Sequence, residues 1–251
     1  MQRYNRVPAI LSSRGPDEYA PANRIMNQLT PDEIRSLYDD QYVERLASHT
    51  LLKNKRLLKY VHFGRSDTVI DIGCGDGSFA YLIHGQVKEY VGVDFSEECI
   101  RRATAKARRL NIPNAEFVCE DIVRYCEKHP RTYDKAFALD FTEHVYDEEL
   151  VRILSAVRIS LKESGLLYLH TPNGGYFLEI LKKRNIIRQF AQHVAVRNGE
   201  EMIELIARAG FRKAAVRYIS HYNRVLWMLH CLSYMPFVGS YFRARIFMVC
   251  Q

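Results

Sequence analysis

The sequence predicts an α/β fold: a doubly wound, mostly parallel sheet of seven strands with helices on both faces. Three observations support this prediction. Short apolar runs alternate with segments of helical character from residue 68 onward. The first run ends in a turn with three glycines, Gly73, Gly75 and Gly77. Helix-start residues such as Ser96 and Asn198 separate the runs. Strands that alternate with helices pair in parallel, because each helix carries the chain back across the sheet.

Local patterns place the individual elements. Strands are predicted at 68–72, 90–93, 115–118, 135–139, 165–170, 211–219 and 244–249. Helices are predicted at 78–84, 96–110, 148–161 and 198–210. Ser96 has the side-chain oxygen that caps a helix N-terminus. Asn198 and Glu201 form a capping-box pattern, and Gly210 is a typical helix end.

The ends of the chain depart from this alternation. Residues 1–30 are polar and contain three prolines, which predicts a loose arm. Thr30 and Pro31 are typical of a helix start, and a helix is expected from there to about Val61. We therefore expect an arm and cap helices over 1–60 and the main domain over 61–251. The mostly apolar segment 221–242 is an insertion before the last strand.

Composition limits the class of protein. The 251 residues, 47% of them hydrophobic, suffice for one α/β domain and not for two. Six cysteines without a CxxC pair are typical of a reducing compartment. The N-terminus lacks the apolar segment of a secretory signal, and the longest apolar run, 225–237, is shorter than the about 20 residues that span a bilayer. We expect a cytoplasmic protein.

The net charge of +7 is unevenly distributed. Residues 66–180 contain 13 Lys/Arg against 19 Asp/Glu, whereas residues 181–251 contain 12 against 3. The basic last third is consistent with an anionic partner, and equally with a solvated basic face.

The glycine-rich turn is the candidate ligand site, because ligands of open α/β sheets bind beyond the carboxyl ends of the strands. It contains Asp71, Gly73, Gly75 and Gly77 in the spacing GxGxG, not the GxGxxG of dinucleotide binders. Glycines let the backbone turn sharply and approach a ligand. A carboxylate before them would repel a pyrophosphate and attract an ammonium group. S-adenosylmethionine has such an ammonium and no phosphate.

Two further acids follow later strands. Asp94 lies 23 residues after Asp71, at a strand end where a carboxylate can accept both ribose hydroxyls. Asp121 follows the third strand and can accept from an adenine amino group. Phe95 and Ile122 are placed to lie against the faces of the ring.

These residues resemble the class I S-adenosylmethionine-dependent methyltransferases over roughly residues 55–215. The resemblance implies a Rossmann-like methyltransferase fold and S-adenosyl-L-methionine as cofactor. In that family the acid and glycine loop hold the methionine part, the second-strand acid holds the ribose, and the Asp-Ile pair holds adenine. The corresponding residues here are Asp71, Gly73, Gly75, Gly77, Asp94, Phe95, Asp121 and Ile122.

Asp140, Glu143 and His144 follow the fourth strand and are expected to line the acceptor side. In a helical turn they share one face, and Asp140 is also counted with the cofactor-binding residues. Glu143 and His144 are the catalytic candidates, because such groups can orient and deprotonate a hydroxyl. The same set could instead bind a divalent cation. His170, at the end of the fifth strand, is expected to line this cleft as a wall residue.

The pattern from Asp140 to His144 resembles E-x-x-E-H in two branches of the family, the ubiquinone-biosynthesis O-methyltransferases and the small-RNA 3′-terminal 2′-O-methyltransferases. Both branches imply a divalent metal such as Mg²⁺. The RNA branch uses a further histidine, and His193 is its positional match, which gives Glu143, His144 and His193 as the candidate metal ligands. Asp140 is one methylene shorter than the glutamate of the pattern. Tyr38 and Tyr42 are candidates for a lid helix, with surface packing as the alternative.

The insertion 221–242 is rich in large apolar residues and is flanked by Arg217, Arg224, Arg243 and Arg245. An apolar surface rimmed by arginines is typical of peripheral membrane contact or of a lipid-linked acceptor. A homodimer interface and a lid over the active site are the alternatives.

The leading hypothesis is therefore O-methylation of a small or lipid-linked acceptor. A metal-dependent RNA 2′-O-methyltransferase is an alternative, although the C-terminal third has no RNA-binding module. A cofactor-binding partner subunit without activity of its own is the non-enzymatic alternative.

Overall fold

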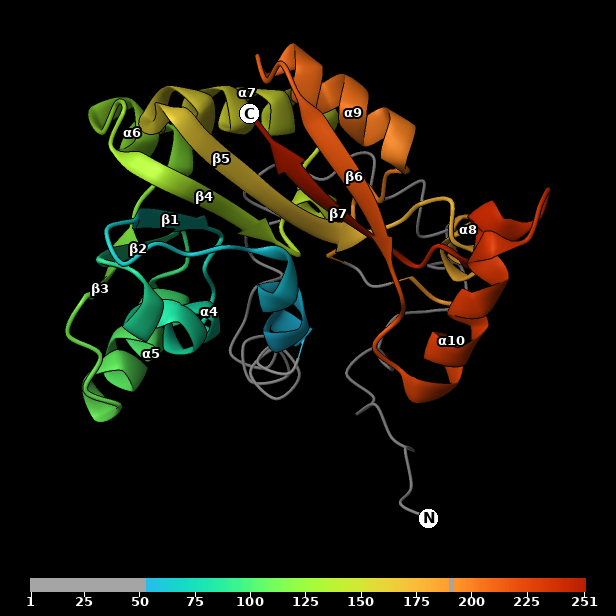
Figure 1. Ribbon diagram of the computed structural model, residues 1–251, viewed down its shortest axis with the longest axis horizontal. Coiled ribbons are helices and arrows are strands. Elements are labelled where there is room, and N and C mark those ends of the chain that lie inside the picture. Colours follow the sequence, from blue (N-terminus) through green and yellow to red (C-terminus); the bar gives the residue numbers. More distant parts are fainter. Residues whose placement is uncertain (1–52, 190–191) are drawn as a thin grey trace, which may run out of the picture.

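The computed structural model describes residues 53–189 and 192–251, and a seven-stranded sheet forms its centre (Figure 1). In chain order the strands are β1 (Thr68–Ile72), β2 (Glu89–Asp94), β3 (Ala115–Cys119), β4 (Tyr133–Leu139), β5 (Leu161–Pro172), β6 (Ala214–Ile219) and β7 (Arg245–Cys250). Their order across the sheet is β3-β2-β1-β4-β5-β7-β6. Strands β1 to β5 pair in parallel, and β7 is antiparallel to both β5 and β6. The predicted doubly wound, mostly parallel sheet is confirmed.

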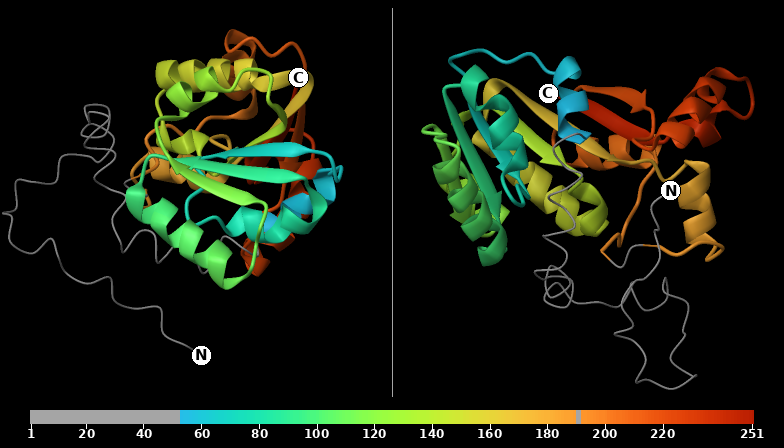
Figure 2. Two further views of the ribbon diagram at one scale, coloured as in Figure 1. Left: turned by 90° about the vertical axis from the view of Figure 1, so that its left-hand side faces the viewer. Right: turned by 90° about the horizontal axis from the view of Figure 1, so that it is seen from below.

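Helices cover both faces of the sheet (Figures 1 and 2). In chain order the helices from α4 on are α4 (Ser78–Ile83), α5 (Glu97–Arg109), α6 (Ile122–Lys128), α7 (Asp147–Ser160), α8 (Phe177–Lys183), α9 (Gly199–Arg208) and α10 (Arg224–Met228). Short 3-10 turns occur at η2 (Leu58–Tyr60), η3 (His84–Gln86), η4 (Thr142–His144), η5 (Leu229–Tyr234) and η6 (Gly239–Phe242).

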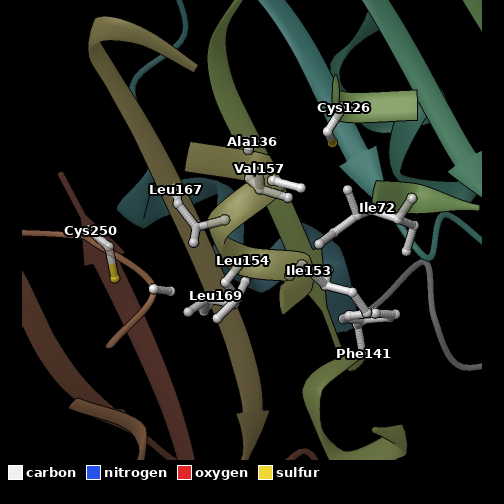
Figure 3. Packing of buried hydrophobic residues seen from close by; sticks show 14 of the residues in the cluster. Ile72, Cys126, Ala136, Phe141, Ile153, Leu154, Val157, Leu167, Leu169 and Cys250 are labelled. Carbon is white, nitrogen blue, oxygen red and sulfur yellow. The ribbon is translucent and has the colours of Figure 1, made fainter. Parts of the chain in front are cut away.

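The core consists of two apolar layers, one on each face of the sheet. In the first layer α6, α7 and α9 pack on β4, β5 and β7. Figure 3 shows part of it, with Leu154 and Val157 of α7 near Leu167 and Leu169 of β5. In the second layer α4 and the helical turn at Leu57 cover the other face. Packing in both layers fixes the carboxyl ends of β1, β2 and β4 relative to one another.

Most predicted elements are present, with changed limits. The predicted strand 211–219 begins only at Ala214, because the Phe211 amide still donates to Ile206 and completes the end of α9. Helices α6 and α8, with seven residues each, were not predicted. Both are short, and neither has a long apolar period. The capping box of Asn198 and Glu201 is confirmed at the start of α9.

The N-terminal predictions fall mostly outside the described residues. Residues 53–57 are helical and continue into η2, as expected of the helix predicted to end near Val61. The arm, Tyr38 and Tyr42 lie outside the described part of the chain. The boundary between a cap over 1–60 and a domain over 61–251 stays a prediction.

The insertion folds as α10, η5 and η6 and projects from one end of the molecule (Figures 1 and 2). Its three flanking arginines outside α10 do not form the expected rim. The Arg217 guanidinium lies 5.1 Å from the Tyr60 ring centroid, and that of Arg243 lies 4.7 Å from the Tyr218 ring. Arg245 points inward and pairs with Asp140. Within the described residues, no helix combines the length and apolarity needed to cross a membrane.

Candidate active site

The turn after β1 is built from left-handed glycines. Gly73, Gly75 and Gly77 have φ values of 66°, 54° and 69°, a region that residues with a Cβ rarely adopt. A Cβ on Gly73 would also come within 2.6 Å of the Phe141 ring. The Gly73 amide donates to the carbonyl of Val93 at 2.8 Å, which ties the turn to the end of β2. The turn therefore presents open backbone beside two strand ends.

Asp94 holds this turn from the end of β2. Its two carboxylate oxygens accept from the Gly75 amide at 3.0 Å and the Ser96 amide at 2.9 Å. The side chain is buried. Burial raises the pKa of Asp94, and the two amide donors oppose that rise.

Asp71, at the end of β1, is a buried carboxylate without a cation beside it among the described residues. The Tyr90 hydroxyl donates to its Oδ2 at 2.5 Å. Burial raises the pKa of Asp71 to about 7; the Tyr90 hydrogen bond opposes this shift, and the nearby Asp94 adds to it. A bound ammonium group would stabilise the ionised form. The environment of Asp71 therefore fits a cationic ligand.

A cavity of about 310 Å³ lies over these strand ends. This volume is at the lower end of the about 300–1,000 Å³ typical of small-molecule sites. The predicted residues that line it are Asp71, Gly73, Gly75, Asp94, Phe95, Asp121, Ile122, Asp140 and His144. Gly77 stands behind the turn, where it begins α4 and where a Cβ would meet the Phe117 ring at 2.7 Å.

The far end of the cavity has the residues expected around a flat ring. Asp121 caps α6, and its carboxylate accepts from the Arg124 amide at 3.1 Å. Ile122 is buried at the start of that helix, and Phe95 is partly exposed after β2. A carboxylate and two apolar side chains lining one cavity are of the kinds that can hold a purine with an amino group.

Asp140 does not share a helical face with Glu143 and His144, so this prediction was wrong. It has a φ of 53° and precedes the turn η4, which contains the other two residues. Its carboxylate contacts Lys53 and Arg245, and it lies 3.2 Å from His170 Nδ1. Asp140 lines the cavity from inside this charged cluster.

Glu143 and His144, both in η4, lie close to His193. One ligand atom of each of the three lies within 4.8 Å of the others. Glu143 is buried and accepts from the Thr171 hydroxyl at 3.1 Å. Burial raises the pKa of Glu143 and lowers the pKa of His193 to about 3. The arrangement places one carboxylate and two imidazoles together, with His144 also in the cavity wall.

The tautomer of His144 follows from its partner. His144 Nδ1 lies 2.8 Å from the carbonyl oxygen of Gln192, which can only accept. Nδ1 therefore carries the proton in the neutral ring, and Nε2 has a lone pair. Such a nitrogen can act as a general base or as a metal ligand.

Arg197 holds the segment that carries Glu143 and His144, a role that was not predicted from the sequence. Its guanidinium donates to the carbonyls of Thr142 and Val145, both at 2.7 Å, and pairs with Asp147. The side chain is 5% exposed. A single arginine gives no signal in one sequence that its target is a loop 50 residues earlier. Tyr90, Lys53 and Arg245 were missed as site residues for the same reason.

The chain matches the family model described as "Methyltransferase domain" over residues 40–216. Among curated relatives, the ubiquinone biosynthesis O-methyltransferase of Neisseria meningitidis serogroup C is 27% identical over 110 residues, which is 43% of this chain and 45% of that protein. The enzyme of the same name from Photorhabdus laumondii is 29% identical over 111 residues, 44% of each chain. The chain thus spans less than half the length of these relatives.

Solved structures share the fold at lower identity. A SAM-dependent methyltransferase from Archaeoglobus fulgidus has a TM-score of 0.65 at 19% identity, with 85% of this chain and all of the other covered. A phosphoethanolamine N-methyltransferase from Haemonchus contortus, in complex with S-adenosylhomocysteine, has a TM-score of 0.59 at 17% identity, with 79% of this chain and 51% of the other covered.

Proposed function

The chain belongs to the methyltransferase-domain family and is an S-adenosylmethionine-dependent methyltransferase, and we propose that it methylates a hydroxyl oxygen of a small or lipid-linked acceptor. The observation that carries the proposal is His144, whose Nδ1 is held by a carbonyl while the ring lines the cavity beside the cofactor-binding residues. The curated relatives are named as O-methyltransferases, which supports oxygen as the methylated atom.

We assign the parts of the cofactor to the residues around the cavity. Asp71 would hold the ammonium group, Asp94 the ribose hydroxyls and Asp121 the adenine amino group, with Phe95 and Ile122 on the ring faces. The raised pKa of Asp71 supports the first assignment, because a cation is the ligand that this carboxyl group lacks. When bound, the cofactor supplies a methyl group already activated by a sulfonium.

His144 would act as the general base. Its Nε2 would accept the acceptor's hydroxyl proton, while the sulfonium of the bound cofactor would supply the methyl group to the oxygen. Such positioned proton transfer contributes about 10²–10⁴-fold to a rate. Most of the remaining rate comes from holding the acceptor in line and excluding water. Arg197 contributes by fixing the loop on which His144 stands.

A second candidate is the cation-dependent form of the reaction, which the cluster of Glu143, His144 and His193 favours. These residues would hold a divalent ion that lowers the pKa of the acceptor hydroxyl. Two imidazoles and one carboxylate suit Mn²⁺, Fe²⁺ or Zn²⁺ better than Mg²⁺, which prefers oxygen ligands. The terminal 2′-hydroxyl of an RNA would be an acceptor of this form.

The test incubates the full chain with isotopically labelled S-adenosylmethionine and three acceptor pools: a catechol probe, a host lipid extract and short RNA. Mass spectrometry then locates the label. We expect an O-methylated catechol or lipid. Label only on nitrogen or carbon would contradict O-methylation, and label only on RNA would favour the second candidate.

Chelation separates the two forms. For the general base, activity survives EDTA, His144→Gln lowers kcat by about 10²–10⁴-fold and His193→Gln has a small effect. For the cation-dependent form, EDTA abolishes activity, Mn²⁺ or Zn²⁺ restores it, and both variants are inactive. Cofactor affinity, measured by calorimetry, should be unchanged in both variants and serves as the control for folding.

A further inference from the structure

The insertion places most of the molecule's exposed large apolar side chains in one short segment. Of fifteen such side chains among the described residues, eight lie between residues 225 and 241. These eight form the surface called here the apolar tip: Val225, Trp227, Met228, Tyr234, Met235, Phe237, Val238 and Tyr241. Leu226, Leu229 and Leu232 of the same segment are half-buried. The insertion thus leaves many of its large apolar side chains exposed to solvent.

Phe237 is the most exposed of these residues, at 99%. Its φ of 64° is left-handed, which is rare for a bulky residue and costs energy. The turn that holds it is nevertheless well built. The Gly239 amide donates to the Met235 carbonyl at 3.0 Å, and a Cβ on Gly239 would meet the Ser233 carbonyl at 2.5 Å. The fold thus leaves the Phe237 ring exposed to solvent, on an insertion that projects from one end of the molecule (Figures 1 and 2).

Basic residues predominate near the apolar tip, and the acidic Glu179 of α8 is buried and pairs with Lys182. The chain has no acidic residue after Glu204, and the insertion itself contains only Arg224 as a permanent charge. Helix α8 lies at the same end of the molecule, where Phe177 contacts Phe242 with ring centroids 5.8 Å apart. The segment after α8 adds exposed Arg184 and Arg188 beside exposed Ile186 and Ile187. Apolar side chains with cations around them complement an anionic bilayer surface.

The start of the insertion, at Tyr222, lies beside residues on the acceptor side of the active site. The Tyr222 hydroxyl lies 2.8 Å from His170 Nε2, and the Arg245 guanidinium lies 5.1 Å from the Tyr222 ring. Arg245 pairs with Asp140, which lines the cavity. A contact made by the apolar tip is thus connected through one short segment to the wall of the cavity.

We propose that the apolar tip inserts into the surface of an anionic phospholipid bilayer, with Phe237 and Trp227 in the interface and Arg224, Arg184 and Arg188 at the headgroups. The docking itself stands on the surface described above; its use to reach a lipid-linked acceptor rests on the proposed function.

Trp227 is the chain's only tryptophan and is 55% exposed, so its fluorescence reports on the apolar tip alone. The experiment titrates the full chain with vesicles of phosphatidylcholine and with vesicles that also contain phosphatidylglycerol. We expect a blue shift of the Trp227 emission and cosedimentation with the anionic vesicles, both weakened by salt. Vesicles of phosphatidylcholine alone should bind more weakly.

Variants test the assignment. Phe237→Ser should weaken vesicle binding by about tenfold or more. Ile159→Ser, a matched change at a 53% exposed residue of α7, should leave it unchanged. Arg224→Glu should weaken binding to anionic vesicles, whereas Arg109→Glu, at the end of α5, should not.

Three outcomes would overturn the proposal: no vesicle binding by the unmodified chain, unchanged binding by Phe237→Ser, or a dimer in solution that Phe237→Ser dissociates. The last outcome would identify the apolar tip as a dimer interface. Calorimetry of S-adenosylmethionine binding, with methyl transfer to the soluble catechol probe, is run in parallel. Failure of those two assays with intact vesicle binding would contradict the proposed function and leave the docking in place.

Discussion

Three aspartates at the ends of β1, β2 and β4 have different ionisation because their partners differ. Asp71 has a tyrosine hydroxyl, and its pKa rises to about 7. Asp94 has two backbone amides, which offset part of the effect of burial. For Asp140 burial alone would raise the pKa, but the charges of Arg245 and Lys53 outweigh it and hold the pKa well below 3.8. One residue type thus occurs in three environments: beside a tyrosine hydroxyl, bound to backbone amides and within an ion-pair network.

Asp71 predicts how cofactor affinity depends on pH. Because a bound ammonium favours the carboxylate, affinity should increase as the pH rises from about 6 to about 7.5, and it should fall above about 8, where an α-amino group loses its proton. Calorimetric titrations across this range measure the profile. Tyr90→Phe should move the lower limb to higher pH, because the hydrogen bond that lowers the pKa of Asp71 is lost. A lower limb that stays in place would contradict this role of Tyr90.

The same shift affects stability with a defined sign. Between about pH 4 and about pH 7 the folded state binds more protons at Asp71 than the unfolded state, so this group makes the free energy of unfolding decrease as pH rises. Asp71→Asn should remove that part of the slope. Denaturant titrations of the cofactor-free chain at several pH values provide the measurement.

Asp94→Asn should weaken S-adenosylmethionine binding by about 100-fold or more. The substitution removes the charged carboxylate that accepts from the turn amides and would accept from the ligand. Asp134→Asn is the matched control: its carboxylate also accepts from a backbone amide, that of Thr68 at 2.9 Å, but it does not line the cavity. Calorimetry on both variants gives the comparison. Equal affinities would remove Asp94 from the cofactor site.

At the scale of elements, loop geometry is controlled by contacts from distant segments. The turn η4 and the residues up to Asp147 are tied to the segment before α9 by the Arg197 guanidinium. The Ala195 amide adds a bond to the Glu143 carbonyl at 3.2 Å. These contacts tie Glu143 and His144 of η4 to a segment about 50 residues later in the chain.

Arg197→Met should destabilise the fold by about 2–4 kcal/mol, because it leaves buried carbonyls without donors. It should also lower kcat while cofactor affinity changes little. Asp147→Asn keeps the carbonyl bonds and removes only a partner that is 61% exposed, so its cost should stay below about 1 kcal/mol. Denaturant unfolding and steady-state kinetics distinguish the two. A cost for Arg197→Met no larger than that of Asp147→Asn would argue against the clamp.

Across the whole molecule, the Asp140 cluster connects parts that are far apart in the chain. Lys53 comes from the first described helix, His170 from β5, Tyr222 from the insertion and Arg245 from β7. Burial and the Arg245 charge lower the pKa of His170 to about 4, so this histidine is neutral near pH 7. The cluster thus joins the helical segment at Lys53, the sheet and the insertion beside the cavity.

Asp140→Asn should destabilise the fold by about 3–5 kcal/mol, because Arg245 and Lys53 would lose their shared counter-charge. The native contribution of Asp140 is fully present above about pH 5 and is lost as the pH falls through about 4 and below, since its folded pKa is depressed. The free energy of unfolding of the variant should therefore decrease less steeply on acidification than that of the unmodified chain. Asp67→Asn, which removes the carboxylate that pairs with Lys135, is the control and should cost less.

The sequence by itself determined the strands, the glycine turn, the two acids after later strands and the cofactor that they imply, because these depend on period, spacing and residue type within short segments. It also grouped Glu143, His144 and His193, although only through a family resemblance. Tertiary structure alone decided that Asp140 pairs with Lys53 and Arg245, that Arg197 holds η4, and that β7 lies between β5 and β6. The physical reason is that buried charges and strand order depend on partners tens to hundreds of residues away, which one sequence does not reveal.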